Sequence, residues 1–159
     1  MAKLLAFFPC GKVVIDRTDN NVSVSDILQE ISAAVPKELM PVPVKAIVPS
    51  SWTVFSMWYR DADIQSAPFD VQSRVIAPDG STLLDALPSS HVTFDNNTKT
   101  SQRVINLLQG FPIGAPGVCH VLLMTKAEGE SDFHEVARYP ILVKHIALEE
   151  VQSSLTSPT

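Results

Sequence analysis

Basic residues are few in this chain of 159 residues, and they form no run along it. Lysine and arginine total 12, against 17 aspartates and glutamates, and the formal net charge is -5. Proteins that bind nucleic acid carry a basic patch, and proteins that bind anionic lipid carry clustered lysines or arginines. The charge pattern therefore argues against nucleic acid and against a membrane surface as partners.

Cysteines and long apolar runs are also scarce. The two cysteines, Cys10 and Cys119, are too few and too far apart for the disulfide framework of a small secreted protein. We expect two buried, reduced thiols in a soluble cytoplasmic protein, with one disulfide between neighbouring strands as the alternative. No apolar stretch reaches the length of about 18 residues that a membrane helix needs.

The N-terminal segment holds a short apolar run, residues 4–8, between Lys3 and Cys10. A lipoprotein signal has a longer apolar run, and it has a small residue before its cysteine where this chain has Pro9. We expect the segment to be retained and to form the first strand.

Strand signals follow one another at intervals of about 8–12 residues. The clearest is residues 69–76, in which Phe69, Val71 and Val75 alternate with polar residues. Pro78-Asp79-Gly80 then predicts a tight turn, because proline fixes φ and glycine accepts a positive φ, so residues 69–87 predict a β-hairpin. Further strands are predicted at residues 4–15, 22–25, 51–59, 91–94, 102–108, 118–125 and 133–148, with a short helix as the alternative for 102–108.

Some segments are harder to interpret. Residues 25–35 fit a strand, but they also fit a helix with Ile27, Leu28 and Ile31 on one face. Prolines place residues 36–49 in a loop or at a sheet edge, and glycines and prolines predict a loop at residues 110–117. Residues 51–59 are apolar on both faces, which is typical of a central strand.

Together these signals predict an all-β fold. Eight or nine short strands without βαβ alternation indicate an antiparallel β-sandwich, immunoglobulin-like or C2-like, with at most one short helix. We expect residues 1–148 to form a single domain and residues 149–159 to form a polar tail.

Several segments share their order with a known family. They are residues 5–16, residues 22–31, the turn at Ala77-Pro78-Asp79-Gly80, and the Phe111-Pro112 segment that ends in Pro116-Gly117-Val118. In this order the chain, over about residues 4–148, resembles an uncharacterised bacterial family of small β-sandwich proteins, known as a domain of unknown function. The resemblance implies a strand at residues 22–31, and it carries over no activity because the family has none assigned.

Signatures of catalysis and of zinc binding are missing from the sequence. It contains no Gly-x-Ser-x-Gly elbow and no closely paired cysteines or histidines. Cys119 and His120 are adjacent, but neighbours on a strand point to opposite faces, so they do not form a nucleophile–base pair. We therefore expect a protein that is not an enzyme and that holds no cofactor.

Two weaker patterns allow for ligand binding. Asp61 and Asp63 lie in one predicted loop and Asp95 in another, so they would form a calcium site if the loops met at one end of the sandwich. Turn formation alone also explains these residues. Trp52 and Trp58 share one face of a strand, where they would stack on a sugar or anchor a partner protein if exposed, and would belong to the core if buried.

The sequence thus favours a non-enzymatic binding or protein-interaction module, as a subunit of a larger assembly. Its expected partner is another protein or a second copy of itself, and the alternative function is a carbohydrate- or calcium-binding β-sandwich. The exposure of the two tryptophans and the placement of the three aspartates distinguish these two functions. An enzyme would need a pocket that holds a histidine with a carboxylate partner.

Overall fold

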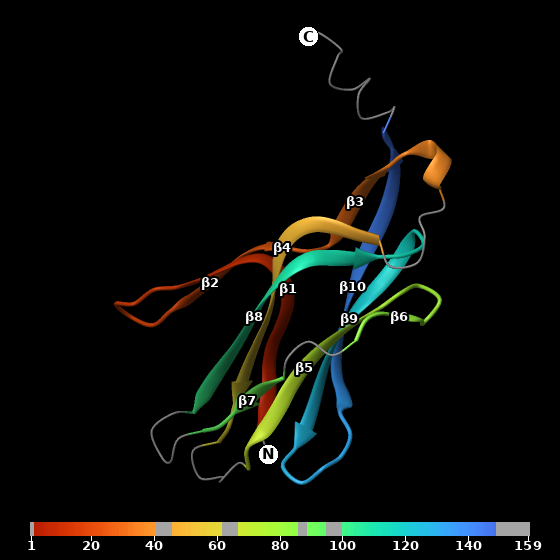
Figure 1. Ribbon diagram of the computed structural model, residues 1–159. Helices are drawn as coiled ribbons and strands as arrows, with labels where there is room; N and C mark the ends of the chain where they lie inside the picture. Colours follow the sequence, from red (N-terminus) through yellow and green to blue (C-terminus); the bar gives the residue numbers. More distant parts are fainter. Residues whose placement is uncertain (1, 41–45, 62–66, 86–88, 95–99, 149–159) are drawn as a thin grey trace.

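The computed structural model describes residues 2–40, 46–61, 67–85, 89–94 and 100–148. In these segments the chain forms ten strands and one 3-10 turn, η1 (Lys37–Leu39), and the strands build two sheets that pack face to face (Figure 1). The predicted all-β sandwich is confirmed. The described residues contain no helix that is long and apolar enough to cross a membrane.

The first sheet has four antiparallel strands in the order β2-β1-β4-β8. Their bounds are β1 (Lys3–Ile15), β2 (Val22–Ile27), β4 (Ala46–Tyr59) and β8 (Ser101–Ile113). Strand β4 pairs with β1 on one side and with β8 on the other, which confirms the inner strand predicted at residues 51–59.

The second sheet has six strands, in the order β3-β10-β9-β5-β6 with β7 also paired to β5. Their bounds are β3 (Glu30–Val35), β5 (Phe69–Ile76), β6 (Thr82–Leu84), β7 (Ser90–Val92), β9 (Gly117–Ala127) and β10 (His134–Ala147). The predicted hairpin is β5 with β6, and its turn uses Gly80 at a φ of +84°.

The sheet is not purely antiparallel, because β3 runs parallel to β10. The chain crosses between the sheets at Leu28 and Gln29 without reversing its direction. The Leu28 N–H donates to the carbonyl of Pro9 in β1, and the Gln29 carbonyl accepts from Leu142 in β10. This crossing makes two strands of a segment that the sequence predicts as one, and it rules out the helix at residues 25–35. Ala33 and Val35 reach the core at alternate positions, as in a strand.

Two predicted loops are shorter than expected. Strand β8 continues through residues 110–113, since Phe111 and Ile113 are buried core residues and Gly110, at a φ of +76°, lets the strand bend beside Ile47. Strand β4 already begins at Ala46, and its Pro49 lies in a bulge where no ladder donor is needed. The predicted tail, residues 149–159, lies outside the described residues.

Candidate functional site

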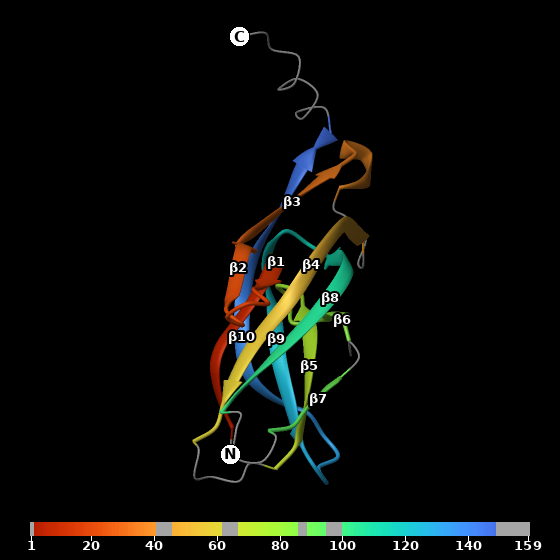
Figure 2. The ribbon, with the colours of Figure 1, turned by 90° about the vertical axis from the view of Figure 1, so that its left-hand side faces the viewer.

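The outer face of the four-stranded sheet is turned toward the viewer in Figure 2. The middle rows of its side chains are mostly apolar. The antiparallel register arranges its side chains in rows across the strands. The rows are Ile27–Cys10–Thr53–Leu107, Phe8–Phe55–Ile105 and Ala6–Met57–Arg103. Arg103 is the single charged residue of these rows. The large side chains Phe8, Ile27, Phe55, Met57, Ile105 and Leu107 are called the apolar face below.

The side of the apolar face that lies on β8 is open to solvent. Leu107 is 68% exposed and Ile105 is 39% exposed, whereas their neighbours Val104 and Leu108 point to the core and are buried. Strand β8 is therefore apolar on both of its faces, although one of them meets water. Exposed apolar side chains that adjoin one another are typical of interaction sites.

The hairpin of β1 and β2 stands out from this sheet, at the left of Figure 1. Its turn is tied to the start of β8 by Arg103. The guanidinium donates to the main-chain oxygen of Asn20 at 2.9 Å and to its Oδ1 at 2.7 Å, and Asn20 has a left-handed φ of +61°. In the rows beside the hairpin, Cys10 and Phe55 are only 0% and 2% exposed, so the part of the face that meets solvent on the side away from the hairpin is the part on β8.

A shallow groove of about 220 Å³ runs between β7, which belongs to the six-stranded sheet, and β8, which is the edge strand of the four-stranded sheet. It is lined by residues 90–93 and residues 102–105. The Gln102 side chain donates to the Thr93 carbonyl at 2.8 Å, and the Ser90 hydroxyl donates to Asn106 Oδ1 at 2.9 Å. These hydrogen bonds join β7 of one sheet to β8 of the other sheet along the groove.

The outer face of the six-stranded sheet, called the polar face below, has more polar side chains, although Val118 and Leu142 lie exposed on it. Its rows place Leu122 between Arg74 and Arg138, and Met124 between Gln72 and Glu135. Leu122 and Met124 are only 6% and 7% exposed, because the stems of these long polar side chains flank them. The Arg138 guanidinium also donates two hydrogen bonds to Glu135, and these hold the pKa of that carboxyl below its ordinary value.

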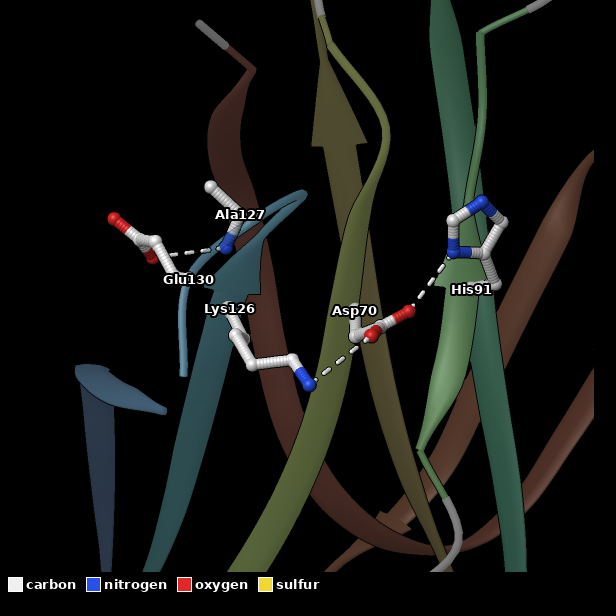
Figure 3. Close-up of polar contacts among 5 residues, drawn as sticks. All are labelled: Asp70, His91, Lys126, Ala127 and Glu130. Carbon is white, nitrogen blue, oxygen red and sulfur yellow. Dashed lines mark hydrogen bonds and ion pairs between the residues drawn. The ribbon is translucent and has the colours of Figure 1, made fainter. Parts of the chain in front are cut away.

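Asp70 on β5 joins histidine and lysine on the same polar face (Figure 3). His91 Nδ1 lies 2.8 Å from Asp70 Oδ1, and Lys126 Nζ lies 3.8 Å from Oδ2. Nearby, the Ala127 N–H donates to the Glu130 carboxylate at 3.0 Å. In the described part of the chain, the hydrogen-bond partner of His91 is the Asp70 carboxylate, and no hydroxyl or thiol bonds to the ring. The arrangement is a surface cluster of one carboxylate with a histidine and a lysine beside the groove.

The two tryptophans singled out from the sequence lie in the core. Trp52 is 1% exposed and packs on Phe111 at a centroid distance of 4.9 Å, and Trp58 is 4% exposed and packs on Phe69 at the same distance. Their indole nitrogens donate to the Gly110 carbonyl and the Ser56 hydroxyl. The hypothesis of an exposed stacking surface is therefore wrong, because burial and internal hydrogen bonds occupy both rings.

Of the three aspartates considered for calcium, the structure describes Asp61. Its carboxylate accepts a hydrogen bond from Lys3 Nζ at 3.0 Å, so a cation already pairs with it. Asp63 and Asp95 lie outside the described residues. Within the described segments, no three histidine, cysteine, aspartate or glutamate side chains come together to hold a metal ion.

Both cysteines are buried free thiols, as expected. Burial raises the pKa of Cys119 to about 11, and it also raises the pKa of Cys10, with a smaller contribution from the charge of Asp26. Cys119 belongs to the core cluster, whereas His120 is on the opposite face of β9. The two residues do not act as a pair.

The apolar face was not predicted from the sequence. Its signal is present at residues 104–108, where Val104 and Leu108 alternate with Ile105 and Leu107, so that both faces are apolar. Such a segment is typical of a central strand, yet β8 lies at a sheet edge. Because the sequence of β8 is apolar on both faces and the strand lies at a sheet edge, one of its apolar faces is left exposed. That exposed face identifies the candidate surface.

The chain matches no known protein-family model and no curated protein. The resemblance to an uncharacterised bacterial family therefore stays a prediction.

Proposed function

We propose that the protein is a non-enzymatic interaction module that binds another protein through the apolar face. The observation that carries the proposal is the exposure of Leu107 and Ile105 in rows that contain one charged residue. Binding surfaces in proteins combine an apolar centre, poor in charge, with a polar rim. Arg103 and Gln109 supply polar groups beside this centre.

The alternatives find less support. Sugar stacking through Trp52 and Trp58 is excluded by their burial, and Asp61 already pairs with Lys3. The His91–Asp70 pair has the histidine and the carboxylate that an enzyme would need. In the described residues, however, no hydroxyl or thiol that could act as a nucleophile is hydrogen-bonded to His91.

We further propose that the protein works in the cytoplasm and as a subunit of a larger assembly. Two free, buried thiols suit a reducing compartment. The net charge of -5 favours a protein partner over a nucleic acid.

Selection of ligands from a displayed library of random peptides tests the proposal. We expect enriched peptides that bind the wild-type protein and lose at least about tenfold in affinity to Leu107→Glu, because the substitution puts a charge into the apolar centre. Val118→Glu is the matched control, since Val118 is an exposed apolar residue on the outer face of the other sheet. Peptides that bind both variants equally, or a library without enriched peptides, would contradict the proposal.

A further inference from the structure

In the segments that the structure describes, no strand pairs with the outer edge of β8, so this edge offers main-chain groups along one side of the apolar face. We propose that a second copy of this chain pairs with this edge, antiparallel and across a twofold axis, so that two four-stranded sheets become one eight-stranded sheet. This inference rests on the proposed function in that it names a partner for the same surface. It differs from it in using the backbone of β8 rather than side chains alone.

Among the edge strands that the structure describes, β8 is the one built to accept a neighbour. It has 13 residues, whereas β6 and β7 have three each and β2 and β3 have six each. Strand β2 is distorted by Asp26 at a φ of +55°, and the start of β3 carries an ion pair of Glu30 with Lys144. Short length, distortion and charge are the usual means by which proteins block edge pairing. From Val104 to Gln109, β8 has none of them.

The hydrogen-bonding phase of β8 can be derived from one contact. The Arg60 N–H donates to the Thr100 carbonyl, so this pair is hydrogen-bonded across β4 and β8. Hydrogen-bonded and non-bonded pairs alternate along an antiparallel ladder. Residues 102, 104, 106 and 108 therefore direct their N–H and C=O groups toward β4. Residues 103, 105, 107 and 109 direct theirs to the free edge.

If a twofold axis passes through Asn106, the free N–H and C=O groups of one copy face the free C=O and N–H groups of the other copy. Ile105 then lies opposite Leu107 of the second copy, and Arg103 lies opposite Gln109 of the second copy. These four residues of each copy would make about eight main-chain hydrogen bonds. No like charges face each other, because Arg103 is the single charged residue of the strand and its guanidinium is held by Asn20. The ladder ends where Gly110, at a φ of +76°, bends the strand.

Self-complementarity favours a second copy over an unrelated extended segment. Ile105 of each copy would lie opposite Leu107 of the other copy, on the same face of the joined sheet. Two apolar side chains opposite each other make a favourable cross-strand pair. An isologous contact of this kind closes after two copies. The result would join two apolar faces into one continuous surface, larger than the surface that one copy presents to a partner.

Amide hydrogen exchange of the full chain, measured by NMR at low and high protein concentration, tests the inference. We expect the amides of Val104, Asn106 and Leu108 to be protected at both concentrations. The amides of Ile105, Leu107 and Gln109 should exchange freely when dilute and become at least about tenfold slower when concentrated. Sedimentation equilibrium of the same samples should show a shift from monomer to dimer.

Two other outcomes would overturn the inference. One is a monomer at all concentrations, with the alternate amides unprotected throughout. The other is a dimer in which these amides stay unprotected, because the copies would then associate through another surface. Neither outcome bears on peptide binding, so a monomer that still binds library peptides would reject the dimer and leave the proposed function standing.

A pair of variants isolates the backbone contribution. Leu107→Pro removes an N–H that points to the free edge, and Leu107→Ala removes the same side chain but keeps that N–H. We expect the dimer to dissociate at least about tenfold more readily in the proline variant than in the alanine variant. If the proline variant does not fold, Ile105→Lys serves in its place, since a lysine on an edge strand opposes pairing without changing the backbone. Equal dimerisation in Ile105→Lys and wild type would contradict the inference.

Discussion

On the outer face of the six-stranded sheet, Leu122 and Met124 lie buried beneath arginine, glutamine and glutamate side chains, whereas on the four-stranded sheet Leu107 and Ile105 lie open to water. Both faces carry leucines on their strands, so apolar content alone does not distinguish them. The difference is in the neighbours. Leu122 and Met124 each have a long polar residue on both flanking strands, whereas, in the segments that the structure describes, β8 has a flanking strand on one side only.

The comparison shows how a sheet face becomes a solvated surface or an interaction surface. Long charged side chains cover apolar atoms with their stems and keep their charges in water. Strand β8 has one such residue, Arg103, and its guanidinium is used to hold the β1–β2 hairpin. The apolar face is thereby left without cover on the side where a partner can approach.

The largest expected effect contrasts two leucines on the two outer faces. Leu122→Ala should lower the free energy of unfolding by about 2–3 kcal/mol, because it removes a buried side chain and leaves a cavity under Arg74 and Arg138. Leu107→Ala should change it by less than about 0.5 kcal/mol in the monomer, since the side chain already meets water. Urea unfolding at low protein concentration measures both values. If the two variants lost similar amounts of unfolding free energy, Leu107 would be as buried as Leu122, which would contradict the contrast between the two faces.

The two cysteines give a second contrast, between the apolar face and the core. At pH 8 both thiols should react with an aromatic disulfide reagent at least about a hundredfold more slowly than in the unfolded chain, because burial raises the pKa of each. Cys119, with a pKa raised to about 11, should remain unreactive until the protein unfolds. Cys10 should react first, since it lies in an outer row of the sheet. Mass spectrometry of the labelled protein identifies the site, and earlier labelling of Cys119 would contradict this order.

The smallest effect concerns the titration of Glu135 on the polar face. Hydrogen bonds from Arg138 hold its pKa below the ordinary value of 4.5, so its stabilising contribution is present above that value and is lost as the pH falls through the lowered pKa. In Arg138→Gln the NMR titration midpoint of Glu135 should rise toward 4.5. An unchanged midpoint would show that Arg138 does not hold the carboxylate in solution.

Local patterns in the sequence predicted the elements that depend on local chemistry. The β5–β6 hairpin follows from alternation and from a proline–glycine turn, and the inner strand β4 follows from Trp52 to Tyr59, which are apolar on both faces. The burial of Trp52 and Trp58 was one of two predicted outcomes. Their rings pack on Phe111 and Phe69, which are distant in the sequence.

Long-range pairing was beyond such patterns. The parallel contact of β3 with β10 joins residues more than a hundred positions apart, and no local signal records it. The edge position of β8 is of the same kind, because strand order is a property of the whole sheet. The candidate site depends on that position, and so the sequence predicted a binding module without locating its surface.

The most direct test of the apolar face as a binding surface is an NMR titration of the labelled protein with a peptide selected for binding. Amide chemical shifts should change at Phe55, Ile105 and Leu107, on the outer face of the four-stranded sheet. They should stay constant at Gln72 and Met124, on the outer face of the six-stranded sheet. Shift changes confined to the polar face or to the core would contradict the assignment of the binding surface to the apolar face.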